Sequence, residues 1–406
     1  MADDPQHAQQ TPGQWAVRWH ALVLGAVLVV SVPLLHLIWH WLLGHDEPLL
    51  RTRSQLPPPA ATIADVLDGS WMLAKDRQLR EDTPVTWWLR STWNELRYRA
   101  GVPESNQVHF GKDEWFFAKE EVYPDRAAFD GAQDSRRRFL GEVRDLVRAA
   151  GAELFVVIDP DKTRIYPDYC YPDGALPACK RDNYAAILAD LRALDIPTAD
   201  LATAIGNERA ANPEQGHPDR ELYYRRDTHW RPAGALAAGR AVAAAIEGRC
   251  GDRLGPRVEM RLSGKTAVRV LCDLPANMAI GTVELADGAG GWRTAPMSLL
   301  AEHLSEVKEY YGVELRRGDT FVAMDGKDPA AEILLIGASF AEENGANAIA
   351  LWLGRPLRVN IHYGATGLAS LREVLPELRA GTKAKVVVWE IVERGIFDPA
   401  WRDQRL

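Results

Sequence analysis

Residues with the chemistry of nucleophilic catalysis occur in two short motifs of this 406-residue chain. Asp227 and His229 stand two positions apart, and Ser339 follows Gly337 and Ala338 far downstream. In an extended backbone, residues i and i+2 project to the same face, so Asp227 would hold one ring nitrogen of His229 while the other faces Ser339. The pattern predicts a Ser-His-Asp enzyme in which His229 is the general base, Asp227 orients it, and Ser339 carries an acyl group.

The serine motif stands where a catalytic group would be exposed. The apolar run 332–336 predicts a strand, Gly337 permits a tight turn, and a helix should begin within a few residues. The backbone N–H groups of Ser339 and Phe340 would then help to stabilise an oxyanion. For Ser339 alone, the alternative is a helix-capping serine. The motif is not the Gly-x-Ser-x-Gly of the α/β-hydrolases, because Ala341 replaces the second glycine.

The elements that must position these motifs alternate between strand and helix. Short apolar runs predict strands at 153–158, 332–336, 357–361 and 385–391. Apolar residues at helical spacing predict helices at 126–150, 183–194, 232–247, 342–353 and 368–379. The alternation predicts an α/β fold, with a parallel sheet covered by helices on both faces and ligands beyond the carboxyl ends of its strands.

Two segments depart from that alternation. Residues 255–325 interrupt it and are expected to form an insertion with a hairpin and irregular loops. Residues 107–117 alternate around a Gly-Lys-Asp turn and predict a small separate hairpin.

The N-terminal region predicts a membrane anchor. Residues 21–43 carry no formal charge and approach the roughly 20 residues that a membrane-spanning helix needs. No small-residue cleavage site follows, which predicts an uncleaved signal anchor. The expected order is a cytoplasmic arm at 1–20, the transmembrane anchor at 21–43, a proline-bearing linker and helical stalk at 44–104, and the catalytic domain at 105–406.

Cysteine spacing bears on the compartment, because loop charge does not: Arg18 precedes the anchor, while Arg51 and Arg53 follow it. The four cysteines form two local pairs without metal-like spacing, Cys170 with Cys179 and Cys250 with Cys272. Two disulfides, each contributing about 2–4 kcal/mol, would favour the periplasm. The alternative is four buried free thiols in a cytoplasmic domain.

Composition excludes some partners. A net charge of −8 gives no basic surplus to displace counterions from phosphates, so nucleic acid is not an expected partner. No metal or cofactor is expected, since the predicted triad needs none. Arginines 136–138 are expected on the solvated face of a helix. Arginines 225, 226 and 231 flank the Asp-His pair and are candidates for binding an anionic or sugar ligand.

The combined motifs resemble the periplasmic alginate O-acetyltransferases of the AlgJ and AlgX type. The resemblance extends over about residues 105–395 and rests on these blocks in order: Gly111-Lys112-Asp113, Asp159-Pro160, Asp227-Thr228-His229-Trp230, Gly337-Ala338-Ser339 and Trp389-Glu390-Ile391. It implies a three-layer α/β/α SGNH-hydrolase-like domain with permuted motif order, because the Asp-His block precedes the serine. One departure is Ala338, where the wider superfamily has aspartate.

The resemblance also implies a function. Ser339, His229 and Asp227 would move acetyl through an acetyl-serine onto hydroxyls of an exported polysaccharide, alginate or another. A membrane-bound O-acyltransferase would supply the acetyl group. Candidates for the oxyanion hole or substrate contacts are Asn360, Tyr363 and Gly364, with Gly367 as a substitute for Gly364. Trp230 is either a sugar platform or part of the core, and Lys162 is either a substrate contact or a surface residue.

Two other functions remain open. The same triad could release acetyl to water, as a polysaccharide acetylesterase or deacetylase, because the outcome depends on how well water is kept out. A non-catalytic polysaccharide-binding subunit is the other alternative. The presence of all three triad residues argues against it.

Overall fold

The computed structural model describes residues 84–102, 107–211, 220–277, 282–286, 292–296, 303–362, 364 and 366–406. The chain divides into two compact units, one formed by residues 1–101 and 278–303 and the other by residues 102–277 and 304–406. The second unit contains both predicted catalytic motifs. The predicted anchor at 21–43 lies outside the described residues, and no helix within the described part is long and apolar enough to cross a membrane.

The first unit has three described elements. These are the helix α4 (Pro84–Arg99) and an antiparallel strand pair, β5 (Thr282–Ala286) with β6 (Trp292–Pro296). The helix falls within the segment that was predicted to form a helical stalk.

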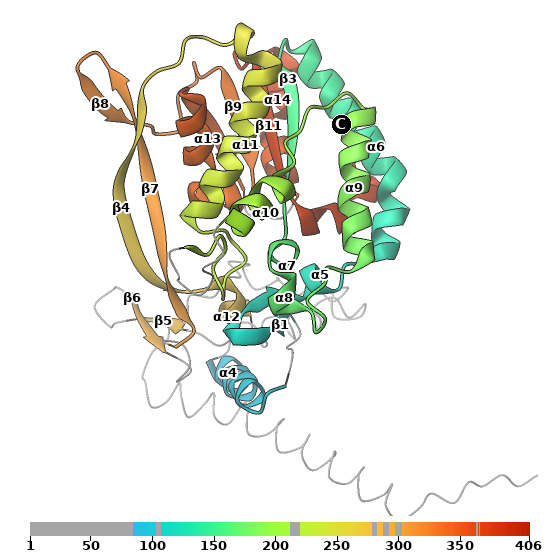
Figure 1. Cartoon of the computed structure of the whole chain (residues 1–406), viewed down its shortest axis with the longest axis vertical. Helices are drawn as coiled ribbons and strands as arrows, with labels where there is room; N and C mark the ends of the chain where they lie inside the picture. Colours follow the sequence, from blue (N-terminus) through green and yellow to red (C-terminus); the bar gives the residue numbers. More distant parts are fainter. Residues whose placement is uncertain are drawn as a thin grey trace, which may run out of the picture. The chain divides into compact units, whose positions relative to one another are not determined.

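A sheet of four parallel strands forms the centre of the second unit, in the order β10-β9-β11-β3 (Figure 1). The strands are β3 (Glu153–Asp159), β9 (Ile333–Gly337), β10 (Leu357–Ile361) and β11 (Val386–Val392). Every residue of β3, β9 and β11 is buried, as a parallel sheet covered on both faces requires. The four predicted strands are confirmed to within one residue at each end.

Helices cover both faces of this sheet. Along β3, Phe155 and Val157 belong to one hydrophobic core, while Leu154 and Val156 belong to the other. The first core includes residues of α10 (Leu201–Ala211), α11 (Pro232–Cys250) and α13 (Ala346–Leu353). The second includes residues of α6 (Arg126–Ala149), α9 (Ala178–Ala193) and α14 (Leu368–Ala380). The predicted three-layer α/β/α fold is confirmed.

Local signals set the ends of these helices. The carboxylate of Asp125 accepts the backbone N–H of Ala128 at 2.9 Å and caps α6. Pro232 opens α11 directly after the loop that carries His229, and proline suits the first turn because it has no N–H to satisfy. Gly354, at φ 63°, ends α13 in the left-handed conformation.

Shorter elements join this framework. The predicted hairpin is confirmed as β1 (Val108–Phe110) and β2 (Phe116–Ala118), joined through η1 (Lys112–Glu114). The remaining short helices are α5 (Lys119–Val122), α7 (Lys162–Ile165), α8 (Pro167–Cys170), η3 (Gly251–Arg253), α12 (Asp273–Asn277), η4 (Ala341–Gly345), η5 (Glu393–Phe397) and η6 (Pro399–Asp403).

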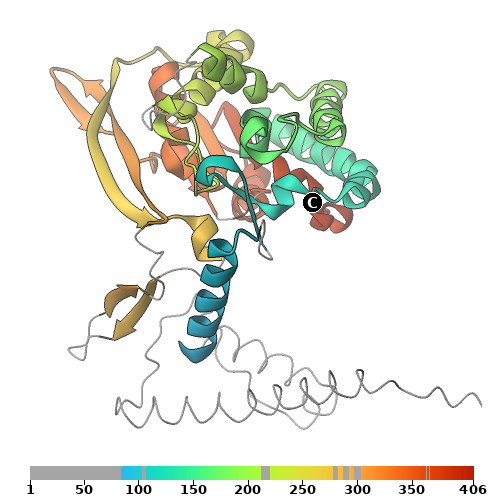
Figure 2. The ribbon, with the colours of Figure 1, turned by 60° about the horizontal axis from the view of Figure 1, so that its bottom comes forward.

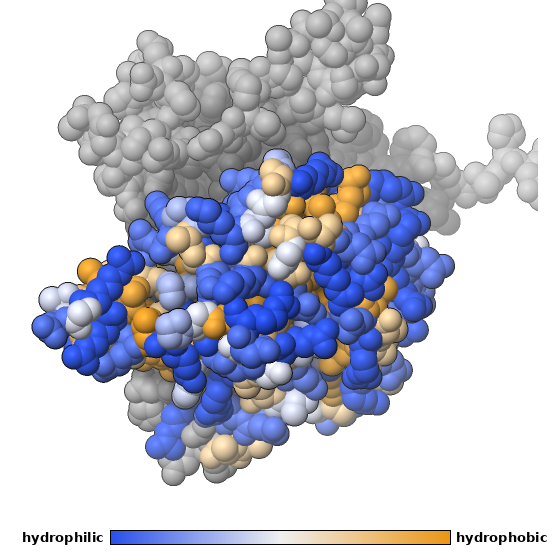
Figure 3. All heavy atoms as spheres, turned by 90° about the horizontal axis from the view of Figure 1, so that it is seen from above, coloured by the Kyte–Doolittle hydropathy of each residue, from blue (hydrophilic) through white to orange (hydrophobic). Residues whose placement is uncertain are grey.

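The predicted insertion is more regular than expected. Its strands β4 (Met260–Leu271), β7 (Ser305–Arg317) and β8 (Thr320–Ala323) form an antiparallel sheet in the order β4-β7-β8. Figures 1 and 2 show β4 and β7 as a long curved ribbon, and β7 contacts both α13 and η4. The described surface in Figure 3 is mostly hydrophilic, with scattered hydrophobic side chains.

The two predicted disulfides are wrong. All four cysteines, Cys170, Cys179, Cys250 and Cys272, are free. Cys250 ends α11, and the 12-residue strand β4, roughly 40 Å long when extended, leads the chain away from it toward Cys272. Cys170 is buried in the first core, whereas Cys179 is half-buried at the start of α9. The cysteines therefore no longer support an oxidising compartment for this domain.

The prediction for arginines 136–138 was partly wrong. Arg137 and Arg138 are solvated, with 44% and 45% of their side chains exposed. Arg136 is buried against the ring of Phe129 and donates a hydrogen bond to the Ile396 carbonyl at 3.1 Å. Arg136 thus fixes α6 to the C-terminal segment, unlike its two exposed neighbours.

Candidate active site

Asp227 and His229 lie on a bent loop, closed by an antiparallel bridge between Tyr223 and Trp230. The extended conformation expected for them is wrong. The Oδ1 atom of Asp227 accepts the backbone N–H of His229 at 3.1 Å and also lies 2.6 Å from its Nδ1. Aspartate commonly stabilises turns in this way, by bonding to the backbone two residues on. The predicted Asp-His contact therefore forms through a turn.

Ser339 lies where the chain leaves β9 and begins a helix. Its Oγ is 2.6 Å from His229 Nε2, so the structure brings the three predicted triad residues together. The Oε2 atom of Glu390, from β11, accepts the N–H groups of Ala338 at 2.9 Å and Ala341 at 3.1 Å and holds this turn. A Cβ at Gly337 would come within 2.7 Å of that carboxylate oxygen, which explains the glycine before the serine.

Burial and charge set the protonation of this group. Asp227 and His229 are 1% and 8% exposed, while Ser339 is partly exposed. Burial alone would raise the pKa of Asp227, but His229 and Lys308 outweigh it and lower the pKa well below the usual range. Burial also opposes charge on His229, but Asp227, Glu343 and Asp273 outweigh it and raise its pKa. The carboxylate is thus ionised beside an imidazole of increased basicity.

Lys162 holds the loop that carries Asp227 and His229 by hydrogen bonds to its backbone. It is fully buried, and its Nζ donates hydrogen bonds to the carbonyls of Tyr224 at 3.1 Å, Arg225 at 3.1 Å and Asp227 at 2.7 Å. Both predictions for Lys162, substrate contact and surface residue, are therefore wrong. An ammonium group has three donor hydrogens, and all three are used to hold the backbone around Asp227.

The three arginines near the Asp-His pair face carboxylates of the protein. The pairs are Arg225 with Glu221, Arg226 with Glu114, and Arg231 with Glu306. Glu306, from β7, also accepts the backbone N–H groups of Arg225 at 3.3 Å and Arg226 at 2.7 Å. These contacts give the arginines a structural role in fixing the loop, which the prediction of a ligand site did not include.

Aromatic residues pack against the imidazole. The ring of Phe340 lies 4.9 Å from the rings of both His229 and Trp230, measured between centroids. Trp230 is 2% exposed, and its Nε1 donates to the Glu343 carbonyl at 2.7 Å. Trp230 is therefore a core residue, and its alternative role as a sugar platform is wrong. The Phe340 side chain is also buried, so only its backbone N–H remains a candidate for the oxyanion hole.

The other predicted oxyanion residues lie in β10, the strand beside β9, or in the segment that follows it. Asn360 hydrogen-bonds Glu373 of α14, and its Oδ1 is buried without a hydrogen-bond partner in the described part of the chain. Gly364 is exposed, and Tyr363 lies outside the described residues. Gly367 has a structural requirement instead: its φ is 61°, and a Cβ there would lie 2.8 Å from the Glu390 carbonyl oxygen. Oxyanion roles for Asn360, Tyr363 and Gly364 stay predictions.

One cluster has the residue types of a metal site. Potential ligand atoms of Asp227, His229 and Asp273 lie within 4.8 Å of one another. The Asp273 carboxylate already accepts the backbone N–H and the hydroxyl of Thr228, and Asp227 Oδ2 accepts the N–H of Asp273 at 3.1 Å. Hydrogen bonds within the protein account for this cluster, and we assign no metal to it.

Sequence reasoning missed several charged residues of the site. They are Asp273 of α12, Lys308 of β7 and Glu343 of η4. All three surround the Asp227–His229 pair, and Lys308 lies 3.0 Å from Asp227 Oδ2. The sequence carries no signal for Lys308, because the alternation of a strand would place its apolar neighbour Val307, and not the lysine, on the buried face.

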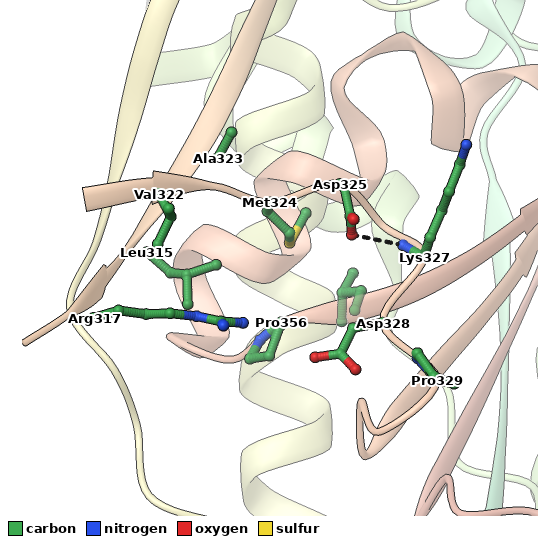
Figure 4. Close-up of a pocket in the computed structure, with 11 residues that line it drawn as sticks. Leu315, Arg317, Val322, Ala323, Met324, Asp325, Lys327, Asp328, Pro329 and Pro356 are labelled. Carbon is green, nitrogen blue, oxygen red and sulfur yellow. Dashed lines mark hydrogen bonds between the residues drawn. The ribbon is translucent and has the colours of Figure 1, made fainter. Parts of the chain in front are cut away.

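Two open cavities lie beside β8 and β10. One, of about 460 Å³, is shown in Figure 4, where Arg317 and Asp328 extend toward Pro356 from opposite sides. The other, of about 370 Å³, is lined by Ala341 and Glu342, which follow closely after Ser339. Residues of the triad line neither cavity, but the second adjoins the helix that begins at the serine.

Comparison with known proteins agrees with this geometry. The family model described as "SGNH hydrolase-like domain, acetyltransferase AlgX" matches residues 108–393. A probable alginate O-acetylase AlgJ of Pseudomonas syringae pv. tomato is 25% identical over 376 residues, which cover 87% of this chain and 86% of that protein.

Solved structures show the same fold. The O-acetyltransferase domain of Pseudomonas putida AlgJ matches with a TM-score of 0.55 and 23% identity, over 73% of this chain and 98% of that one. Pseudomonas aeruginosa AlgX matches with a TM-score of 0.50 and 19% identity, over 70% of this chain and 61% of that one.

Proposed function

Because this chain belongs to the family of SGNH hydrolase-like acetyltransferase domains of the AlgX type, we propose that it transfers acetyl groups to polysaccharide hydroxyls through an acetyl-Ser339 intermediate. One observation carries the proposal: Ser339 Oγ lies 2.6 Å from His229 Nε2, and His229 Nδ1 lies 2.6 Å from Asp227 Oδ1. These contacts join nucleophile, base and orienting carboxylate in the order that acyl transfer requires.

The first half of the reaction loads the enzyme. His229 Nε2 takes the proton of Ser339 Oγ, and the oxygen attacks the carbonyl carbon of an acetyl donor. Asp227 stabilises the imidazolium that forms. The leaving group of the donor then departs with the proton from His229, and acetyl remains on Ser339. The N–H groups at the start of the helix, on Ser339 and Phe340, would stabilise the developing oxyanion.

The second half transfers acetyl to the sugar. His229 takes the proton of an acceptor hydroxyl, and the hydroxyl oxygen attacks the acetyl-serine carbonyl. When the bond to Ser339 Oγ breaks, the serine regains a proton from His229, and the enzyme returns to its starting state. The same base therefore serves both halves without a net change in protonation.

The acceptor is proposed from the relatives. They are named alginate O-acetylases and an alginate biosynthesis protein, which supports an exported polysaccharide as the acceptor of this chain. A membrane-bound O-acyltransferase is the proposed source of acetyl.

The experiment that tests this function separates transfer from hydrolysis. The full-length protein is incubated with an activated acetyl ester, with and without polysaccharide fragments, and O-acetylated sugar and free acetate are both measured. Acetylated sugar that depends on Ser339 supports the transferase. Free acetate alone, in the presence of acceptor, would identify an esterase, and no acetyl turnover would leave a non-catalytic subunit.

We also propose that residues 21–43 anchor the chain in the inner membrane with the catalytic domain in the periplasm. The uncharged apolar run supports the anchor, and an exported acceptor supports the orientation. Protease added to spheroplasts should digest the catalytic domain while cytoplasmic proteins stay intact. Protection of the domain in intact spheroplasts would contradict the proposal.

A further inference from the structure

Lys308 occupies a position in β7 that reverses the usual polarity of a strand. It is 6% exposed, whereas the apolar Val307 beside it is 39% exposed. Successive side chains of a strand point to opposite faces, so a shift of one residue would bury the valine and release the lysine. The strand instead keeps a charged group inside. Since burying an unpaired ammonium is costly, specific partners must stabilise it there.

Those partners belong to both halves of the active site. Lys308 Nζ lies 3.0 Å from Asp227 Oδ2 and 2.6 Å from Glu343 Oε1. Asp227 orients His229, while Glu343 belongs to η4, which directly follows the Ser339 turn. A single ammonium from the insertion thus joins the loop of the base to the helix of the nucleophile.

The backbone of η4 is shaped to make this contact. Its residue Asn344 has φ 70°, a left-handed conformation that is uncommon outside glycine. Asn344 Oδ1 accepts the N–H of Tyr311, and its Nδ2 donates to the Glu309 carbonyl, both at 2.9 Å. Hydrogen bonds to β7 therefore hold the distorted turn that directs Glu343 toward Lys308 and His229.

Carboxylates surround the imidazole. The Nδ1 atom of His229 lies 2.6 Å from Asp227, 3.7 Å from Glu343 and 3.9 Å from Asp273. Ionised carboxylates at these distances all favour the imidazolium, which cannot accept a proton from serine. The acidic groups facing this site are Asp227, Asp273, Glu306, Glu343 and Glu390. The other titratable and charged groups facing it are Lys162, Tyr224, Cys272, Lys308, Tyr310 and Arg394.

Lys308 differs from the other cations because it alone among them pairs with two of the carboxylates around Nδ1. Lys162 donates its hydrogen bonds to backbone carbonyls, and Arg394 pairs with Glu120 and Glu121. We infer that Lys308 is a positioning residue that favours the neutral form of His229, which accepts the Ser339 proton, by offsetting part of the charge of Asp227 and Glu343. This inference rests on the proposed function, since it deepens the role of the same site.

The pH dependence of acetyl transfer tests this role. For Lys308→Met, the rise of kcat with pH, which reports the neutral form of His229, should move to higher pH, and kcat at pH 7 should fall by about tenfold or more. Activity should recover at alkaline pH. Glu343→Gln removes one of the opposing charges and should move the same limb to lower pH. The double variant should return it toward the wild-type position, and Lys308→Arg, which keeps the cation, should largely preserve the profile.

A second measurement does not depend on catalysis. The full-length protein is labelled with ¹³C at its histidine rings, the His229 signal is identified by its loss in His229→Gln, and its titration is followed by NMR. The titration midpoint should rise in Lys308→Met and fall in Glu343→Gln. Lys265→Met is the matched control, because this lysine lies on the partner strand β4 with 47% of its side chain exposed, and it should change neither profile nor titration.

The outcomes separate two failures. If the wild type transfers no acetyl, the proposed function fails, while the NMR titration still decides what Lys308 does to His229. If the wild type is active but Lys308→Met leaves both the pH limb and the titration unchanged, or lowers kcat equally at every pH, the inference is overturned. Should Lys308→Met fail to fold, Lys308→Gln decides, because its amide is polar but carries no charge: a shift of the limb to higher pH supports the inference, and an unchanged limb overturns it.

Discussion

The two halves of the active site are built in different ways. Ser339 stands at the junction of a buried parallel strand and a helix, so regular backbone places it. Asp227 and His229 lie on a bent loop, which side chains from distant parts of the chain hold in position. Lys162 reaches it from α7, and Lys308 reaches it from β7.

The position of Ser339 is therefore set by regular backbone, whereas the position of the Asp-His pair is set by charged side chains. At the serine, the strand end and a tight glycine turn restrict the geometry, and one carboxylate, Glu390, completes it. At the Asp-His loop no ladder of strand hydrogen bonds exists beyond the Tyr223–Trp230 bridge, so buried cations satisfy the carbonyls and carboxylates. The loop should therefore be the half more sensitive to loss of a single charged side chain.

The largest effect is expected from the carboxylate that orients the base. Asp227→Asn should lower kcat by about 10⁴-fold, because an amide at this position favours the wrong tautomer of His229. Steady-state acetyl transfer from an activated ester measures this. Asp273→Asn is the control, since that carboxylate is 3.9 Å from Nδ1 and bonds Thr228 instead. Equal losses in the two variants would contradict the assigned roles.

The stability of the fold should depend strongly on Lys162, which holds the Asp-His loop. Lys162→Met removes three hydrogen bonds and leaves the carbonyls of Tyr224 and Asp227 without their donor, while that of Arg225 keeps the N–H of Phe116. The change should lower the free energy of unfolding by about 3 kcal/mol, at about 1 kcal/mol for each lost hydrogen bond. Urea unfolding measures the change. Lys112→Met is matched to it, because Lys112 also donates to two carbonyls, those of Asp168 and Tyr171, but in an exposed place. It should cost less than about 1 kcal/mol, and a similar loss in both variants would show that burial is not the cause.

The serine half should respond to pH through Glu390. Burial raises the pKa of Glu390 from 4.5 to about 7. The folded protein therefore keeps this proton where the unfolded chain releases it, so the contribution of Glu390 to stability falls as pH rises from about 4.5 to about 7 and is constant above. Glu390→Gln removes that dependence while its amide oxygen still accepts from Ala338 and Ala341.

Relative to wild type, Glu390→Gln should thus gain about 1–3 kcal/mol of stability across this pH range, which urea unfolding at several pH values measures. A difference between the two proteins that is independent of pH would mean that Glu390 titrates normally in the fold.

The smallest effect is expected at Trp230, which, like Lys308, links the two halves of the site. Trp230 stands on the Asp-His loop, and its Nε1 donates to the Glu343 carbonyl behind the serine. Trp230→Phe should cost about 1 kcal/mol for the lost hydrogen bond. The KM for polysaccharide acceptor should change by less than about twofold, because a core residue does not contact the sugar. A large rise in KM with unchanged stability would restore the sugar-platform role.

The same contrast explains what the sequence could predict. The strands and the serine turn follow from short apolar runs and one glycine, which are local signals, and the predicted strands agree with β3, β9, β10 and β11. The Asp-His pair was identified by residue type and spacing, although its backbone was predicted as extended and is bent. The contact needs only two side chains that stand two positions apart. The bend of the backbone is also held by hydrogen bonds from distant residues, such as Lys162.

The charged surroundings could not be predicted because they depend on distant pairings. Lysine is a residue type that usually lies at the surface. Only the fold shows that Lys162 is buried and donates hydrogen bonds to three carbonyls. Lys308 lies in an insertion with no motif, and its burial depends on the register of β4 with β7. The cysteine pairs failed for the same reason, since proximity along the chain does not bring Cys250 and Cys272 together.

The most direct test of the central claim is to detect the acyl-enzyme. The full-length protein is incubated with an activated acetyl ester without acceptor, quenched in acid, digested and examined by mass spectrometry. One acetyl group should appear on the peptide that contains Ser339, be lost when polysaccharide fragments are added before quenching, and be absent from Ser339→Ala. Acetylated polysaccharide formed at the wild-type rate by Ser339→Ala, or acetyl that reaches the sugar without passing through Ser339, would contradict the account.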